Sequence, residues 1–308
     1  MMRLPLLLSL LLLGGCTALQ PARAPLPAAS SDVPPAGEYD NHAQVWAAGG
    51  EGGALPPPHV SVVIEPVGDD AWSLWHIRLD GQVPMQATWA MQRRDAGSGA
   101  VLLPHRASVA SPAPADRFTA AEWTPLDACA LQATGAGGGF VADAAACALL
   151  APGIGPAAAL LPLAAAQVGD TLRLRLYADQ ARGPEAHEEA RRVEWFTGWA
   201  AVNGAGPTAT ATADDWHMDR TLALGSEGGR AALPWRDGSP SGYSLRLERL
   251  AYRDGEVPVL KLSVIEDASG AVLAYAWANP EATRIGINLG WLQVGLERGA
   301  KPAVAHPD

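Results

Sequence analysis

The sequence predicts a mainly β protein with antiparallel sheets, arranged as a sandwich or a barrel-like meander, and with an Ala-rich, partly helical middle section. Three observations predict this fold class. Leu and Arg alternate through residues 171–177, which is typical of a strand with one buried face. Asp-Gly pairs at 80–81 and 254–255 favour tight turns between antiparallel neighbours. Residues 120–133 and 141–166 are instead rich in Ala and Leu and interrupted by Pro and Gly.

The first β-rich region spans residues 59–167 and passes into the Ala-rich section. A strand is expected over residues 59–65, and the alternating segment 71–79 follows it. The Asp80-Gly81 turn then allows residues 85–91 to return as a hairpin partner.

The second β-rich region spans residues 168–298 and precedes a tail over 299–308. Short turns separate three of its strands, which predicts an antiparallel meander over residues 243–252, 257–265 and 271–278. Two further segments, 285–289 and 291–296, could extend that meander.

Composition excludes several classes of protein. The 308 residues carry a net charge of −10, whereas a nucleic-acid partner requires clustered Lys and Arg. A hydrophobic content of 48% argues against disorder throughout, and a mean hydropathy of +0.04 argues against a polytopic membrane protein. Residues 144–168 lack charge, but Pro152, Pro156 and Pro162 interrupt them, so we expect a buried helical section rather than a membrane span.

The first fifteen residues have the pattern of an export signal. Arg3 provides a positive charge, and residues 4–13 form a Leu-rich stretch that is too short to cross a bilayer as a helix. The stretch ends in Leu13-Gly14-Gly15-Cys16. These four residues resemble the lipobox of bacterial lipoproteins, which has Leu, two small residues and then Cys.

The resemblance covers only this leader, and it implies how the leader is processed. Residues 1–15 would be removed as a signal peptide, and Cys16 would carry diacylglycerol on its sulfur and an acyl chain on its new amine. Two or three acyl chains anchor a protein stably in a bilayer. Thr17 stands where Asp would indicate inner-membrane retention in the family, so the resemblance implies an outer-membrane protein facing the periplasm.

Residues 16–58 contain mainly Pro, Ala, Gly and Ser, which predicts a flexible tether between the anchor and the folded part, with local docking of Tyr39, Val45 and Trp46 onto the domain as the alternative. Beyond Cys16 the chain contains two cysteines, Cys129 and Cys147. An isolated even pair in an oxidising compartment predicts a disulfide that closes the Gly-rich segment between them. Two free buried thiols or a redox pair are the alternatives, although no C-x-x-C spacing is present.

Residues 214–219 form the densest cluster of ligand-type side chains. On a strand, Asp215, His217 and Asp219 would share one face, and the core face would carry Trp216, Met218 and Leu222. The three could bind a divalent cation or support acid–base chemistry, but no distant fourth ligand is evident, so we expect a solvated strand face.

Two other patterns favour structural explanations. Residues 184–192 have acids early and Arg late, which predicts a charged surface helix in which His187 is a candidate base. Residues 153–158 match G-x-G-x-x-A, but Pro156 removes an N–H that a pyrophosphate would need, and no cofactor is expected.

The chain contains eleven Trp, most of which we expect in the core, although exposed Trp can stack on sugar rings or form protein contacts. Together these observations favour a non-enzymatic lipoprotein that binds an envelope protein or a cell-wall glycan, or maintains the envelope. The alternatives are an envelope hydrolase that uses Asp215, His217 and Asp219, and a periplasmic inhibitor or immunity protein.

Overall fold

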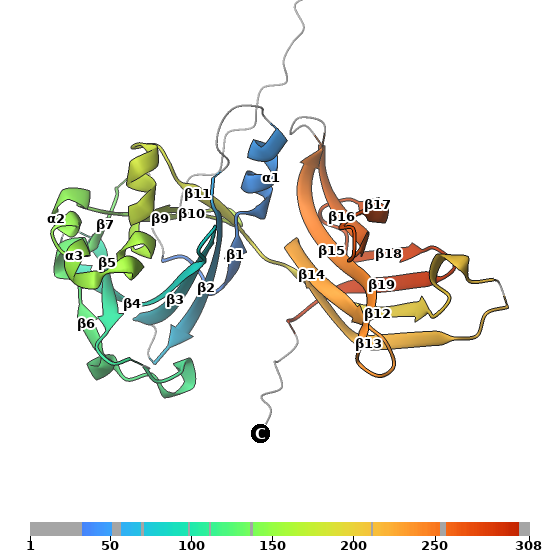
Figure 1. Ribbon diagram of the computed structural model, residues 1–308. Helices are drawn as coiled ribbons and strands as arrows, with labels where there is room; N and C mark the ends of the chain where they lie inside the picture. The colour runs from blue at the N-terminus through green and yellow to red at the C-terminus, as the bar shows by residue number, and fades with distance from the viewer. Residues whose placement is uncertain are drawn as a thin grey trace, which may run out of the picture.

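A computed structural model describes residues 33–50, 57–68, 71–97, 99–110, 112–135, 138–210, 212–252 and 257–301. The leader, Cys16 and the tether up to residue 32 lie outside this range, so the predictions of a signal peptide and a lipid anchor fall on residues that the structure does not describe. The chain forms two lobes that lie side by side, with helix α1 (His42–Gly50) between them (Figure 1).

The first lobe is a single antiparallel sheet that closes on itself. Ten strands form the ring in the order β4-β3-β2-β1-β11-β10-β9-β8-β7-β5, and pairing of β5 with β4 completes it. Strand β6 pairs with β5 outside the ring. The strands are β1 (Gly37–Asp40), β2 (His59–Val67), β3 (Trp72–Asp80), β4 (Met85–Ala96), β5 (Gly99–Ala107), β6 (Trp123–Pro125), β7 (Leu131–Ala133), β8 (Phe140–Ala142), β9 (Pro162–Val168), β10 (Thr171–Leu176) and β11 (Glu188–Arg192).

Large side chains fill the ring, so its inside is a packed core. Alternate residues of each strand point inward; in β10 they are Leu172, Leu174 and Leu176, all fully buried. Trp75 and Trp89 are the largest buried side chains, and Trp89 Nε1 donates to the carbonyl of Leu160 at 3.0 Å. That bond attaches the 3₁₀ helix η4 (Pro156–Leu160) to the sheet.

The middle section is partly helical, as predicted. It contains α2 (Ala144–Ala148) and α3 (Ala151–Ile154), and Asp143 begins α2 by accepting from the N–H groups of Ala145 and Ala146. Short 3₁₀ helices occur there and elsewhere: η1 (Ala115–Arg117), η2 (Ala120–Glu122), η3 (Asp127–Cys129), η5 (Tyr177–Arg182) and η6 (Gly206–Thr208). A disulfide between Cys129 and Cys147 joins η3 to α2 and confirms that prediction. In the part of the chain that the structure describes, no helix is both long and apolar enough to cross a membrane.

The second lobe is a sandwich of two four-stranded antiparallel sheets. One sheet has the order β13-β12-β19-β18 and the other β14-β15-β16-β17, and Leu, Val, Ile and aromatic side chains from both fill the space between them. The strands are β12 (Trp195–Asn203), β13 (Trp216–Gly225), β14 (Glu227–Pro234), β15 (Pro240–Tyr252), β16 (Val257–Glu266), β17 (Val272–Ala278), β18 (Arg284–Asn288) and β19 (Leu292–Gly299).

The predicted fold class is confirmed, as are the hairpin β3–β4 and the meander β15–β16–β17. The segments 285–289 and 291–296 instead form β18 and β19 in the opposite sheet, where β19 pairs with β12. The sequence divides the β-rich regions at residue 167, but the first sheet continues to Arg192 because β10 pairs with β9 and β11 with β1.

The tether prediction is wrong for residues 37–50, which form β1 and α1. Strand β1 pairs with β2 on one side and β11 on the other, so backbone hydrogen bonds hold it on both edges. Tyr39 on β1 is fully buried, and its hydroxyl donates to the carbonyl of Pro35 at 2.8 Å. Burial of Tyr39 and pairing with two flanking strands help to order a segment whose overall composition favours disorder.

Candidate functional site

The structure does not bring Asp215, His217 and Asp219 together. Asp215 is exposed and pairs with Arg236, whereas the carboxylate of Asp219 accepts from the N–H and hydroxyl of Thr221 at 2.8 and 2.7 Å. The ring of His217 lies 6.1 Å from that of Trp235. No group of three His, Cys, Asp or Glu side chains among the described residues could hold a metal ion.

A β-bulge explains why the predicted faces of this strand are wrong. Ala200 opposes Asp219 and Gly198 opposes Leu222, so two residues of β13 face Trp199 alone. Before the bulge, the extra residue exchanges the two faces of β13, so that side chains expected in the core point outward and the others inward. Met218, expected in the core, is therefore 44% exposed, and His217 opposes the buried Val202.

The charged segment 184–192 ends in strand β11 rather than forming a helix. Glu188 is fully buried there, where it accepts from Asn41 at 2.6 Å and pairs with Arg182. Burial raises the pKa of Glu188, although the positive charge of Arg182 opposes the shift. His187 lies beside Arg173 and Arg175 in a surface groove of about 250 Å³. Its Nδ1 is 2.7 Å from the carbonyl of Glu185, so the ring is held by a neighbouring turn.

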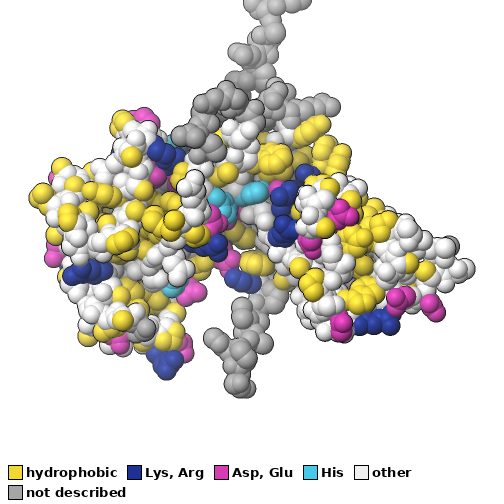
Figure 2. Space-filling model, viewed as in Figure 1, with side chains coloured by type: hydrophobic (Ala, Val, Ile, Leu, Met, Phe, Trp, Pro, Cys, Tyr) yellow, Lys and Arg dark blue, Asp and Glu magenta, His cyan; other side chains and the backbone are white. Residues whose placement is uncertain are grey.

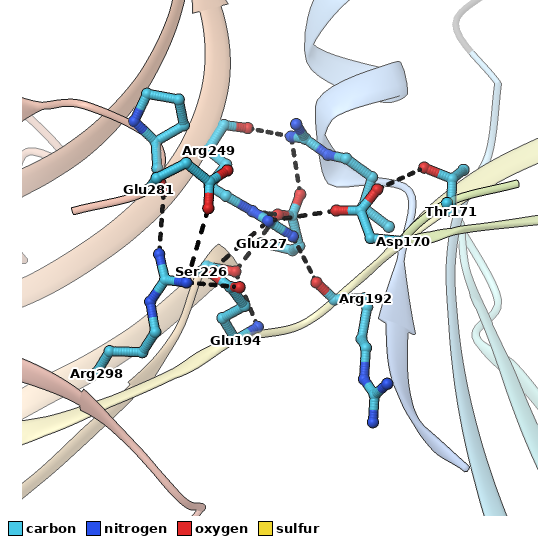
Figure 3. A network of polar contacts seen from close by, with 12 residues as sticks. Asp170, Thr171, Arg192, Glu194, Ser226, Glu227, Arg249, Glu281 and Arg298 are labelled. Atoms are coloured by element: carbon cyan, nitrogen blue, oxygen red, sulfur yellow. Dashed lines mark hydrogen bonds and ion pairs between the residues drawn. The ribbon is translucent and has the colours of Figure 1, made fainter. Parts of the chain in front are cut away.

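Arg, Lys, Asp, Glu and His side chains gather between the two lobes (Figure 2). Arg249 of β15 is at the centre of one network, with its Nε 2.5 Å from Glu227 and its Nη1 3.4 Å from Asp170 (Figure 3). Arg191 of the first lobe contacts the same Glu227 at 3.0 Å. Burial raises the pKa of Glu227, and the charges of Arg191 and Arg249 oppose that shift. The network therefore joins β11 of the first lobe to β14 and β15 of the second.

Helix α1 makes a second junction between the lobes by lying on the outer face of sheet β14–β17. His42 Nε2 is 3.0 Å from the buried Glu248 on β15, and Lys261 on β16 lies 3.7 Å from the same carboxylate. Burial alone would raise the pKa of Glu248, but the hydrogen bond with His42 and the charges of Arg246 and Lys261 lower it. Lys261 also lies over the ring of Trp46, 5.7 Å from its centroid.

Beside α1, the same sheet face carries a cluster of exposed aromatic and aliphatic side chains, here termed the aromatic patch. Thirteen large apolar side chains are exposed in the described residues, and seven of them lie on α1 or on β15, β16 and β17. Each of the seven is between 42% and 58% exposed: Trp46, Tyr252, Val257, Val272, Leu273, Tyr275 and Trp277. Such concentration marks an interaction surface more often than chance.

The rings in the aromatic patch contact one another. Trp277 is 4.6 Å from Tyr252 and 5.3 Å from Tyr275, measured between ring centroids. Lys261, directly opposite Trp277 on the neighbouring strand, lies 5.8 Å from the centre of the Tyr275 ring. Because the rings support each other, little side-chain entropy remains to be lost when a ligand binds.

The expectation that most Trp lie in the core holds only in part. Of the eleven Trp, the structure buries Trp75, Trp89, Trp123 and Trp291, exposes Trp46, Trp199 and Trp277, and leaves the other four half-buried. The signal for the patch was present in residues 271–278, an uncharged run with aromatic residues at alternate positions on an edge strand.

Comparison with known proteins gives no further guide, because no protein family, curated protein or solved structure matches this chain.

Proposed function

We propose that this protein is an outer-membrane lipoprotein, facing the periplasm, that acts as a non-enzymatic binding module and contacts its partner through the aromatic patch. The observation that carries the binding role is the concentration of exposed apolar side chains beside α1. The anchoring role is supported by the lipobox-like residues that end at Cys16. The disulfide Cys129–Cys147 is consistent with an oxidising compartment outside the cytoplasm.

The chemistry of the aromatic patch favours a protein partner over a cell-wall glycan. Its surface is largely aromatic and aliphatic, and Lys261, the cation within it, is only 16% exposed. Glycan sites need several polar side chains around the stacking ring to bind hydroxyl groups, whereas the centres of protein interfaces are rich in Tyr and Trp and poor in charge.

The test is photo-crosslinking in intact cells with a benzophenone amino acid at position 252. Tyr252 lies in the aromatic patch, and Leu149, which is 83% exposed in the first lobe, is the control position. We expect an adduct with a distinct envelope protein at position 252 and none at 149. Identical adducts at both positions, or no adduct at 252, would contradict the proposal.

A sedimentation assay with purified cell-wall sacculi tests the alternative that the partner is a cell-wall glycan. A protein partner predicts that wild type and Trp277→Ala sediment equally with sacculi. Trp199 is exposed on the opposite sheet, so Trp199→Ala is the control. If the wild type binds sacculi, Trp277→Ala abolishes this binding and Trp199→Ala preserves it, the partner is a glycan and not a protein.

A further inference from the structure

Strand β17 is an edge strand without protective charges, although a bulge at Leu273 interrupts its pairing with β16 near its start. It is the last strand of the order β14-β15-β16-β17, and among the described residues it pairs with β16 alone. Its sequence, Val-Leu-Ala-Tyr-Ala-Trp-Ala, contains no charged residue and no Pro. Natural edge strands usually carry Lys, Pro or inward-facing charge, because an open row of N–H and C=O groups pairs readily with another strand.

We propose that β17 pairs with β17 of a second copy of this chain, in an antiparallel register about a two-fold axis at Tyr275. The two four-stranded sheets then become one continuous eight-stranded sheet. In this register Leu273 opposes Trp277 of the second copy, and Ala274 opposes its Ala276. Each pair occurs twice, as two-fold symmetry requires.

The side chains of β17 suit this register. An aromatic ring opposite an aliphatic side chain is a favourable cross-strand pair. Leu273, Tyr275 and Trp277 are all exposed, whereas Ala274 and Ala276 lie opposite Val264 and Leu262 of the sandwich core. The symmetric register therefore places large side chains opposite large ones on the outer face, and small opposite small on the inner face.

Charge does not oppose a second copy at this edge. The chain has a net charge of −10, so most surfaces of two copies repel each other. The strand is uncharged, and the neighbouring cation Lys261 is held beside Glu248, so no like charges are brought together across the axis. An interface of one strand pair is small and gives weak association, which confinement to a membrane surface would strengthen.

The pairing uses the backbone edge of β17, whereas the proposed partner contacts the side-chain face of the aromatic patch. Either can therefore hold without the other, and the crosslink at position 252 distinguishes them by the mass of its adduct.

The register is tested with single cysteines in the full-length chain, expressed in cells and analysed on non-reducing gels. Tyr275→Cys places two thiols directly opposite each other, at the Cα separation that a disulfide needs. Leu273→Cys places them four residues apart along the strands, roughly 13 Å, which is too far. Cys129 and Cys147 are already joined to each other, so Cys16 is the other cysteine that could form a disulfide between copies. The parental chain shows how much dimer Cys16 produces by itself.

The expected result is a shift of Tyr275→Cys from the monomer position, near 32 kDa, to a band of twice that mass, with Leu273→Cys and the parental chain unshifted. Co-expression of Leu273→Cys with Trp277→Cys should restore the dimer band. Dimers of Leu273→Cys alone, or no dimer of Tyr275→Cys, would overturn the proposed pairing. A band of another mass would assign the edge to a different protein.

A second measurement needs no disulfide. Two differently tagged copies of the full chain should co-purify, and Tyr275→Lys in both should abolish their co-purification, because it places two cations at the axis. Leu149→Lys is the matched control at an exposed site of the first lobe. Unchanged co-purification with Tyr275→Lys, in protein that keeps the wild-type melting temperature, would refute pairing at this edge.

Discussion

Replacing Arg249 by Met tests whether the network between the lobes stabilises the protein. The Arg249 side chain is 7% exposed and the Glu227 carboxylate is fully buried, so the substitution removes a buried cation and leaves a buried anion. Asp170 and Glu194 also lose a partner, but both are more exposed than Glu227. The main cost is therefore the uncompensated charge of Glu227.

Breaking a buried ion pair by removing one partner typically costs about 3–5 kcal/mol. Arg191 still contacts Glu227 at 3.0 Å, which favours the lower end, about 3 kcal/mol. The double variant Arg249→Met with Glu227→Gln should recover much of this loss, because no buried charge remains.

The assay is guanidinium unfolding at pH 7 and pH 4. Burial already raises the pKa of Glu227, and loss of Arg249 raises it further. A carboxyl whose folded pKa is raised stabilises the fold fully below its unfolded pKa, and this contribution is lost as pH rises through the folded pKa. The deficit of Arg249→Met relative to wild type should therefore be large at pH 7 and small at pH 4.

Arg284→Met is the matched control, because Arg284 and Glu297 form an ion pair in which both side chains are exposed. A deficit of Arg249→Met no greater than that of Arg284→Met, or one that does not shrink in acid, would refute the reasoning.

Three further predictions concern separate parts of the chain. Replacing both Cys129 and Cys147 by Ala should lower the free energy of unfolding by about 3 kcal/mol, because the disulfide closes a loop with a sequence separation of 18; a loss below 1 kcal/mol by denaturant titration would contradict this. A hydrogen bond to Asp40 contributes most to raising the pKa of His59 to about 9, so the stability it adds is complete below pH 6.5 and is lost as pH rises through about 9. The melting temperature of wild type should thus exceed that of His59→Gln at pH 6 but not at pH 10, and a constant difference would exclude this role. Cys16→Ser should lose a labelled palmitate signal and leave the membrane fraction; a variant that keeps both is not anchored through this sulfur.

The sequence pattern predicted the strands in which apolar and polar residues alternate and the apolar ones are buried. Leu172, Leu174 and Leu176 point into the ring as the period of two requires, and the hairpin and meander follow from their turns. Other features depended on distant partners. Strand β1 is ordered by β2 and β11, which lie far apart in sequence, and β19 pairs with β12 rather than extending the meander.

The candidate site was predictable only in part, for the same reason. The bulge opposite Trp199 reverses the faces of β13, and it arises from a mismatch in length with β12 that no local pattern records. The aromatic patch requires Tyr252, Tyr275 and Trp277 to meet across the sheet, and α1 to lie beside them. The sequence showed aromatic residues on strands but not which of them a second sheet would leave uncovered.

The position of β1 determines how a mechanical load would enter the molecule. Among the described elements, β1 is the first that a pull from the amino-terminal side would load, and it is hydrogen-bonded on both edges. If the pull acts along the strand axis, the hydrogen bonds between β1 and its two neighbours are loaded in shear. They then break together rather than one after another. Because α1 follows directly and rests on the second lobe through His42 and Glu248, tension applied from that end would be shared by both lobes.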